Sequence, residues 1–522
     1  MKKILVFALF VAIGNVIFAQ SVEMDWGSSV VLEKNTWYKN VIGYDKDGYY
    51  VVKSKSATEF PDDGTYLEYI SSTTNTIEST NQIIMPNVNG IQTHYFDMYY
   101  LNQKLILLTY ANVSSQKILY IQYLNQDGTL KNKPKDIASI PLTNAPKDNF
   151  EVKLINGKIG VVYHNTFASY NNEAIQFKLI NPDLTEDVNV SLNFPLVGRS
   201  FDIIQFDAGK SGYLYFLTKC LEIGKKKPAP GKAADEKYVY IMLAYNPKRK
   251  EFAQFQVKAD KYVAANAIFG LDKEENIYIA GFFANKTVKF ANEFMGAYYM
   301  KINPRTQKID VLDPKKSTRV FSKDFMAECS QERNGTSPAQ YYNYILKDFL
   351  FFDNGGFAVI AEQEYTIGDD IVDPASKKVT HVDNYYYNDL IVFGVTKEGV
   401  LAWNIRVAKN QYSPDDKGFY HSYVAFSESN KLKIVFNDNK SNLNNKVAAK
   451  TKQLKNNPVL TPKGLATIVS IFPDGSFEKY AMFKDQDEKF VIIPKMVYNI
   501  GKRFVTYAQD GKSIKFGSFT FE

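Results

Sequence analysis

Cysteine and histidine are scarce in this sequence, which has two cysteines and four histidines among 522 residues. Two cysteines without a nearby pair of histidines do not make a zinc site, and neither a metal nor a cofactor is expected. Cys220 and Cys329 are compatible with one disulfide in an oxidising compartment or with two buried free thiols.

Familiar catalytic motifs are also missing. The sequence has no phosphate-binding glycine loop, no serine nucleophile elbow and no helix with paired histidines. Asp45-Lys46-Asp47-Gly48 begins like a calcium loop, but the remaining ligands and the terminal glutamate are absent, so a turn is predicted there. No reaction is therefore indicated by motif alone.

Only the first residues contain a long apolar run. Lys2 and Lys3 precede the apolar residues of Ile4–Phe18, and the small residue Ala19 stands before Gln20. This pattern predicts a signal peptide over residues 1–19 and export to the periplasm, the cell surface or the medium. Gly14-Asn15 interrupts the run, which is shorter than the ~20 residues that span a bilayer. We expect a monomer without a transmembrane segment after signal removal.

Charge of either sign is not concentrated enough to suggest nucleic acid as a partner. The chain carries 63 basic and 56 acidic residues, and loss of Lys2 and Lys3 lowers the net charge from +7 to +5. Nucleic-acid binding needs basic residues gathered on one face, and export argues against it.

A hairpin over Asn388–Lys409 shows the pattern that the rest of the chain repeats. Two runs rich in β-branched and aromatic residues, Leu390–Val395 and Val400–Val407, flank a short turn that ends at Gly399. Leu390 and Val392 lie on one face of the first run, and Ile391, Phe393 and Val395 lie on the other. Because both faces are apolar, we expect this strand to be covered on both sides, as in the outer half of a propeller blade.

Turn signals divide the chain into units of four strands. Asn, Asp, Pro and Gly supply the backbone angles that such turns need. The first turn of each unit lies at 45–48, 102–103, 156–157, 208–212, 272–276, 353–356, 427–430 and 499–501. Repeats of four short strands are typical of a β-propeller.

The ends of the chain complete this interpretation. The last unit offers three strands, and Ser29–Leu32 is the natural fourth partner of Ser513–Phe521. We predict an all-β, eight-bladed propeller over residues 20–522, closed by the two terminal strands, which removes open sheet edges. Seven blades, or two β-sandwich domains, are the alternatives, although no stretch like a linker divides the chain.

The fifth unit adds a resemblance. Gly281-Phe282-Phe283, Thr287–Phe290 and Ala297–Lys301 resemble a bacterial β-propeller repeat that has a glycine-aromatic start and an aromatic-x-x-lysine end. That family has an aspartate just before its final aromatic strand, where this chain has Gly296-Ala297. The whole chain resembles secreted propeller-like proteins of Gram-negative bacteria, and this resemblance implies a fold without an activity.

Five long segments are predicted on one face of the propeller, opposite the tight turns. They are loops at 222–237, 284–295, 322–342, 364–388 and 437–463. Long loops on a rigid scaffold often carry binding. The aromatic and basic residues of these loops that we select as binding candidates are Tyr341, Tyr342, Tyr385, Tyr386, Tyr387, Lys446 and Lys450.

Two functions follow from this arrangement. The main hypothesis is a non-enzymatic scaffold whose long-loop face binds a glycan, a peptide or an envelope protein. The alternative is a carbohydrate-active hydrolase or lyase at the channel mouth, using paired carboxylates, a histidine or a tyrosine. The candidates near the starts of innermost strands are His94, Asp97, Asp202, Asp348, His421 and Lys495.

Overall fold

The computed structural model describes the chain from residue 22 onward with several gaps. The described ranges are 22–142, 149–164, 174–196, 201–222, 237–285, 293–310, 312–329, 342–372, 374–444, 451–455, 464–483 and 490–521. The predicted signal peptide lies outside the described residues. Within these ranges, no helix is both long and apolar enough to cross a bilayer.

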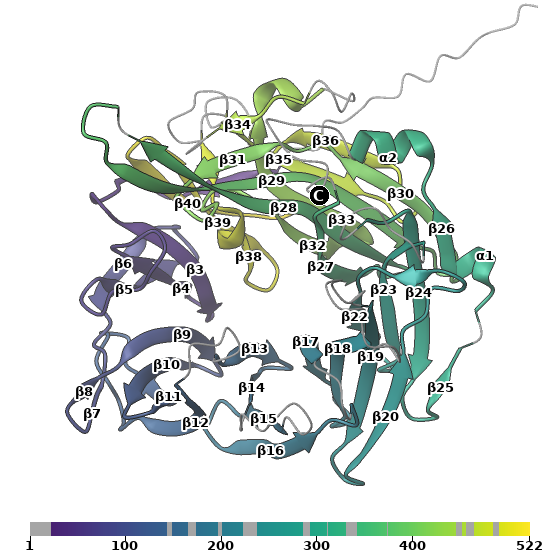
Figure 1. Ribbon diagram of the computed structural model, residues 1–522. Coiled ribbons are helices and arrows are strands. Elements are labelled where there is room, and N and C mark those ends of the chain that lie inside the picture. Colours follow the sequence, from purple (N-terminus) through teal and green to yellow (C-terminus); the bar gives the residue numbers. More distant parts are fainter. Residues whose placement is uncertain are drawn as a thin grey trace, which may run out of the picture.

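The protein is all-β and propeller-like, and its strands pair antiparallel with their neighbours in sequence (Figure 1). The first sheet contains β3 (Trp37–Tyr44), β4 (Gly48–Ser54), β5 (Thr65–Ser71) and β6 (Ile77–Gln82). The second contains β9 (His94–Leu101), β10 (Lys104–Val113), β11 (Gln116–Leu124) and β12 (Lys135–Pro141). The third contains β13 (Glu151–Ile155), β14 (Lys158–His164), β15 (Ala174–Ile180) and β16 (Glu186–Asn193). The fourth contains β17 (Phe201–Ala208), β18 (Leu214–Glu222), β19 (Lys237–Asn246) and β20 (Glu251–Gln256).

The later sheets carry extra strands. The fifth contains β21 (Val263–Ala264), β22 (Ile268–Leu271), β23 (Ile277–Ala284), β24 (Gly296–Asn303), β25 (Lys308–Ile309) and β26 (Thr318–Val320). The sixth contains β27 (Tyr344–Phe351), β28 (Phe357–Val372), β29 (Val379–Val395), β30 (Leu401–Val407), β31 (Gln411–Pro414) and β34 (Leu454–Lys455). The seventh contains β32 (Val424–Glu428), β33 (Lys431–Asn439), β35 (Gly464–Ile471) and β36 (Phe477–Ala481).

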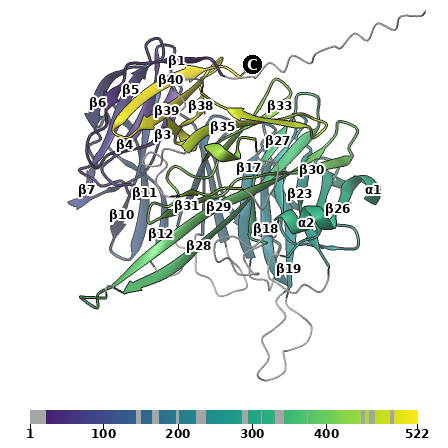
Figure 2. The same ribbon diagram turned by 90° about the horizontal axis from the view of Figure 1, so that it is seen from above.

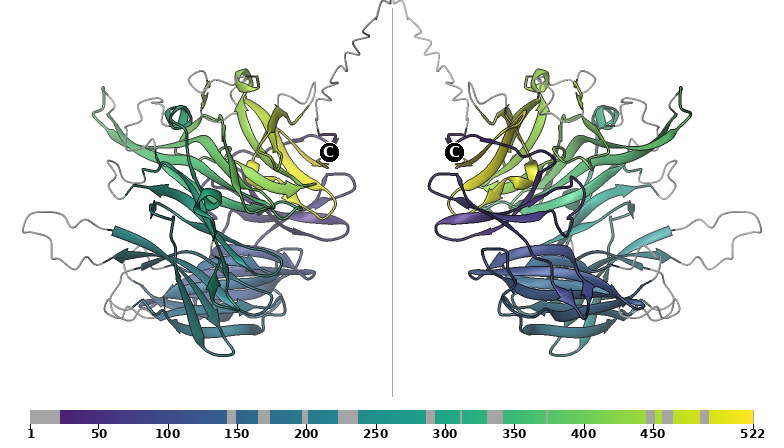
Figure 3. Two further views of the ribbon diagram at one scale, coloured as in Figure 1. Left: turned by 90° about the vertical axis from the view of Figure 1, so that its right-hand side faces the viewer. Right: turned by 90° about the vertical axis from the view of Figure 1, so that its left-hand side faces the viewer.

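The eighth sheet joins the two ends of the chain. It contains β37 (Val491–Ile492), β38 (Tyr498–Asn499), β39 (Phe504–Asp510) and β40 (Ser513–Phe519), together with β1 (Met24–Trp26) and β2 (Val30–Val31). Val30 lies opposite Ile514 and Met24 lies opposite Phe519, so both N-terminal strands pair with β40. The side views show these first and last strands side by side (Figure 3).

A separate hairpin and two short helices lie outside this pattern. The hairpin consists of β7 (Asn87–Val88) and β8 (Ile91–Gln92), and the helices are α1 (Pro314–Ser317) and α2 (Lys323–Cys329). The larger sheets are arranged around the middle of the molecule, and β3, β9, β13, β17, β22 and β27 lie on the side of their sheets that faces it (Figure 1).

The hydrophobic core is divided into clusters that lie between neighbouring sheets. Leu390 and Val392 of β29 pack toward the seventh sheet, whereas Ile391, Phe393 and Val395 pack toward the fifth. The predicted two-sided burial of this strand is therefore confirmed. Full burial of each such side chain contributes about 1.5–3 kcal/mol, so the interfaces between sheets are the main source of stability.

One predicted loop is a pair of strands instead. The segment 364–388 contains the far ends of β28 and β29, which pair from Glu364 opposite Tyr387 to Val372 opposite Val379. Together they form a ribbon that extends beyond the body of the molecule (Figure 2). The prediction failed because carboxylates and tyrosines interrupt the apolar pattern of this segment. The backbone hydrogen bonds between β28 and β29 nevertheless continue through it, since they do not depend on apolar side chains. Of the other predicted loops, 322–342 contains α2, and 437–463 contains the end of β33 and all of β34.

Candidate functional site

A cavity of about 170 Å³ lies where the third and fourth sheets meet. Its lining contains two carboxylates and one imidazole: Glu151 begins β13, Asp202 is the second residue of β17, and His164 ends β14. Asn149, Val162, Tyr163 and Ile203 complete the lining. Three strands from two sheets thus bring acid–base side chains to one place.

Strand alternation explains why these groups face the cavity. Phe201 is buried and contacts Phe194 with ring centroids 5.3 Å apart, so its neighbour Asp202 points to the opposite, open side. On the third sheet Glu151 pairs with Val162, which places His164 just beyond the start of β13. The apolar cluster shared by the third and fourth sheets holds the two edges of the cavity together.

The electrostatics of the cavity favour a proton donor. Burial raises the pKa of the Glu151 carboxyl, and nearby Lys153 lowers it only in part. The Glu151 side chain is nevertheless exposed to solvent, so it lies in a concave, partly dehydrated setting rather than inside the core. A carboxyl group of this kind keeps its proton to a higher pH than a free glutamate does.

Of the six predicted catalytic candidates, Asp202 is the one that lines this cavity. Asp348 on β27 accepts a hydrogen bond of 2.6 Å from the Tyr423 hydroxyl, and burial raises its pKa. Asp97 on β9 accepts a 2.5 Å hydrogen bond from the Tyr99 hydroxyl, and burial raises its pKa as well. Both side chains are held in local pairs on innermost strands.

His421 and Lys495 are brought together at another part of the centre. His421 is buried, which lowers its pKa, and neither ring nitrogen has a hydrogen bond of good geometry within the described residues. The Lys495 ammonium lies 4.8 Å from the centre of the Phe419 ring, and the Lys39 ammonium lies 6.0 Å from the same ring centre. Burial and repulsion from Lys495 lower the pKa of Lys39 to about 8.

The sixth candidate, His94, lies elsewhere. Its Nδ1 atom is 3.1 Å from Asp62, and both side chains are partly exposed. This arrangement is a surface ion pair, which contributes little to stability.

The predicted aromatic binding residues contact other parts of the protein. Tyr386 stacks on Tyr365 at 4.8 Å and lies 5.1 Å from Tyr412. The Tyr387 hydroxyl donates to the backbone of Lys417, and Tyr385 is half-buried. Their binding role stays a prediction. Tyr342 contacts Phe294, while Tyr341, Lys446 and Lys450 lie outside the described residues.

A network of buried charges lies between β28 and β31. The Glu362 carboxylate is fully buried and lies 2.5 Å from the ammonium groups of both Lys409 and Lys347. Lys409 is fully buried too and donates to the backbone oxygen of Tyr387 and the side-chain oxygen of Gln411. Because these charged groups form hydrogen bonds and ion pairs with one another, we interpret the network as stabilising the fold rather than binding a ligand.

Neither metal ligands nor a disulfide add to the site. No group of three or more His, Cys, Asp or Glu side chains able to hold a metal occurs in the part of the chain that the structure describes. Cys220 and Cys329 are both buried and are not joined in a disulfide, which resolves the two alternatives that the sequence leaves open.

Comparisons with known proteins give only structural likenesses. No protein-family model and no curated protein matches the chain. Polysaccharide lyase Uly1 is 8% identical with a TM-score of 0.37, and the match covers 95% of this chain and 100% of that one. An ulvan lyase of polysaccharide lyase family PL25, bound to -[GlcA(1-4)Rha3S]-, is 9% identical with a TM-score of 0.38, covering 88% and 98%. The Bombyx mori GH32 β-fructofuranosidase BmSUC1 is 10% identical with a TM-score of 0.22, covering 96% and 94%.

These likenesses correct the main functional hypothesis. The non-enzymatic scaffold is not retained: the similar structures include polysaccharide lyases, a glycoside hydrolase and a prolyl oligopeptidase, all of them enzymes. Their TM-scores and identities are low, so they assign neither a substrate nor any residue to this chain. The case for a function therefore rests on the cavity.

Sequence reasoning missed Glu151 and the role of His164. Glu151 is the first residue of an innermost strand and Asp202 is the second residue of another. The position of Glu151 in the repeat could therefore have identified it as a candidate in the same way. His164 ends a second strand, and only the packing of two sheets brings it to the same cavity as Asp202.

Proposed function

We propose that the protein is a carbohydrate-active enzyme, a hydrolase or a lyase, that cleaves a glycosidic bond at the cavity between the third and fourth sheets. The observation that carries this proposal is the shared lining: Glu151, His164 and Asp202 reach one cavity from three strands. Both reaction classes need an acid and a base on either side of the scissile bond, and this lining supplies both.

The three side chains have distinct roles in the proposed chemistry. Glu151, whose pKa is raised by burial, donates a proton to the departing glycosidic oxygen. In hydrolysis, Asp202 acts as the nucleophile or activates water. In elimination, His164 removes a carbon-bound proton as the glycosidic bond breaks, and the electron pair forms a double bond in the product.

The scaffold that positions this site is proposed to be an eight-bladed propeller closed by its two ends. Support comes from the apolar clusters, since each joins two sheets that follow one another in the chain. One further cluster joins the eighth sheet to the first, through Tyr507 and Phe516 on one side and Tyr38 and Val51 on the other.

A truncation tests this closure. A chain that begins at residue 33 loses β1 and β2, which leaves one edge of β40 unpaired. We expect a lower unfolding temperature and self-association, because an open strand edge pairs with other chains. A chain that begins at residue 22 is the matched control, and both are compared by thermal unfolding and gel filtration. Equal stability of the two chains would rule out a closing role for these strands.

Export completes the proposal. Residues 1–19 have the charged start, apolar run and small final residue of a signal peptide, which fits an enzyme that meets polysaccharides outside the cytoplasm. Expression with and without these residues, followed by fractionation of the cells, measures whether they direct export.

The enzymatic proposal is tested on a panel of neutral and acidic polysaccharides. Reducing ends appear in both reactions, whereas an unsaturated product that absorbs ultraviolet light appears only in elimination. We expect the protein to degrade one polysaccharide class. If the product shows hydrolysis, Asp202→Asn is expected to lose the activity, and if it shows elimination, His164→Gln is expected to lose it, while each variant unfolds at the wild-type temperature. Glu78→Gln, on the outer strand β6, is the control. An Asp202→Asn variant that still hydrolyses, or a His164→Gln variant that still eliminates, would contradict the assignment.

A further inference from the structure

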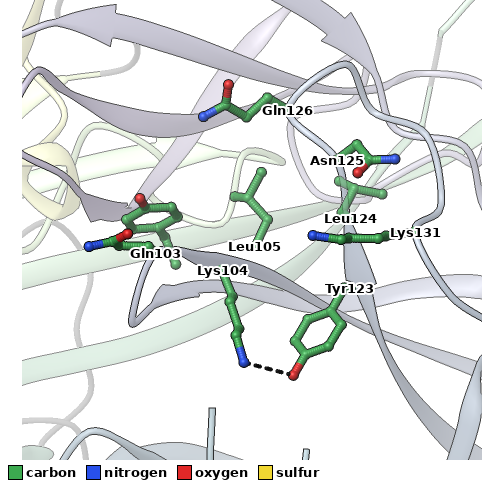
Figure 4. A pocket seen from close by; sticks show the side chains of 9 residues that line it. Gln103, Lys104, Leu105, Tyr123, Leu124, Asn125, Gln126 and Lys131 are labelled. Atoms are coloured by element: carbon green, nitrogen blue, oxygen red, sulfur yellow. Dashed lines mark hydrogen bonds between the residues drawn. The ribbon is translucent and has the colours of Figure 1, made fainter. Parts of the chain in front are cut away.

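A second hollow, of about 200 Å³, lies on the second sheet (Figure 4). It is lined by Tyr100, Gln103, Lys104, Leu105, Tyr123, Leu124, Asn125, Gln126 and Lys131. These residues come from the end of β9, the turn after it and the start of β10, and from the end of β11 and the segment that follows it. The hollow therefore lies where the innermost strand of its sheet ends, whereas Glu151 and Asp202 lie where innermost strands begin.

The lining is basic and contains no acidic side chain. Lys104 donates to the Tyr123 hydroxyl at 3.3 Å, and its ammonium lies 5.1 Å from the centre of that ring. The Tyr123 hydroxyl in turn donates to the backbone oxygen of Pro182, so the ring and the ammonium are held in place. Asp183 lies outside the lining, and its pKa is lowered first by hydrogen bonds from Thr185 and to a smaller extent by the charge of Lys104.

Lys131 supplies a second ammonium group. Its side chain is exposed, and Figure 4 shows its nitrogen turned toward the middle of the hollow. Within the described residues, neither Lys104 nor Lys131 forms an ion pair with a carboxylate. Two cations beside a hollow whose lining contains no carboxylate favour an anionic ligand.

The remaining lining suits a single sugar ring. Leu105 and Leu124 are buried and give an apolar floor, while Tyr100 and Tyr123 offer aromatic rings. Gln103 and Asn125 also line the hollow, and their side-chain amides can exchange hydrogen bonds with hydroxyl groups, although Asn125 Nδ2 already donates to the Thr129 hydroxyl. Apolar surface with a few convergent polar groups is the usual composition of a small-molecule site.

We propose that this hollow is a second, non-catalytic binding site for an acidic sugar unit. The sugar carboxylate lies between the ammonium groups of Lys104 and Lys131, and its ring packs against the tyrosines and leucines of the lining. This site does not depend on the proposed reaction, because it shares no residue with the cavity of Glu151 and Asp202.

The test measures binding of D-glucuronate to the full chain by titration calorimetry, with D-glucose and acetate as comparison ligands. We expect glucuronate to bind more tightly than either, because glucose has the sugar ring without the carboxylate and acetate has the carboxylate without the ring. Lys104→Met and Lys131→Met are each expected to weaken glucuronate binding at least about tenfold, the loss of one charge-assisted hydrogen bond. Lys248→Met, an exposed lysine in another turn, is the control.

Three results would overturn the proposal: no glucuronate binding, unchanged binding in Lys104→Met, or acetate binding as tightly as glucuronate. Thermal unfolding of each variant checks that the fold is intact. The Asp202→Asn variant is expected to bind glucuronate like the wild type, so failure of the enzymatic proposal and failure of this site give different results. A glucuronate-ended oligosaccharide, titrated in the same way, distinguishes a free sugar from the end of a chain.

Discussion

Replacing Lys409 with methionine is expected to lower the free energy of unfolding by about 3–5 kcal/mol, the usual cost of removing one partner from a buried ion pair. Lys409 and Glu362 are both fully buried, with their charged atoms 2.5 Å apart. Methionine fills most of the lysine volume but leaves the Glu362 carboxylate with Lys347 as its one remaining cation. Urea unfolding measures the loss.

Two control variants distinguish the effect of burying an ion pair from the effect of losing a charge. Lys158 forms an ion pair of 2.7 Å with Asp187 at the surface, so Lys158→Met is expected to change stability by less than about 1 kcal/mol. The double variant Lys409→Met with Glu362→Gln removes both charges and should recover part of the loss. Equal effects of Lys409→Met and Lys158→Met would show that the buried network contributes no more than a surface pair.

The same network makes stability depend on pH in a defined direction. Burial by itself would raise the pKa of Glu362, but Lys409 and Lys347 outweigh it and hold the pKa below its ordinary value. A carboxyl group with a lowered pKa stabilises the folded state above its unfolded pKa of about 4.3. This contribution is lost as the pH falls toward the folded pKa. The difference in free energy of unfolding between the wild type and Lys409→Met should therefore become smaller in acid.

Replacing Glu151 with glutamine is expected to reduce kcat/KM by about 10²–10⁴-fold on the polysaccharide that the protein cleaves, the range for loss of a general acid. Glutamine keeps the shape of the side chain but has no proton to donate. Because burial raises the pKa of Glu151, wild-type activity should fall on the alkaline side at a higher pH than a free glutamate would give. Initial rates across a pH series measure both effects.

The outcome for different substrates sharpens this test. A substrate with an activated leaving group needs less proton donation, so Glu151→Gln should retain far more activity on it than on the natural glycosidic bond. Equal losses on both substrates would indicate a structural role for Glu151. Glu78→Gln, whose carboxylate lies on the outer strand β6, should match the wild type throughout.

The residues at the starts of the innermost strands show which part of the candidate site could be predicted from the sequence. Asp202 was selected because its position near the start of an innermost strand predicts a place at the channel mouth, whereas Glu151 has an equivalent position and was not selected. The convergence of both with His164 depends on the angle between two sheets, which the packing of Phe194, Phe201 and their neighbours sets.

By itself, the sequence determined the strands, their turns and the two-sided burial of Leu390–Val395, because strand periodicity and turn chemistry are local. It also placed the terminal strands beside each other, since an incomplete last unit needs a partner. The tertiary structure alone decided that 364–388 forms a paired ribbon, that the two cysteines form no disulfide, and that two carboxylates and an imidazole share one cavity. Those outcomes depend on contacts between residues far apart in the chain, and no local pattern encodes such distances.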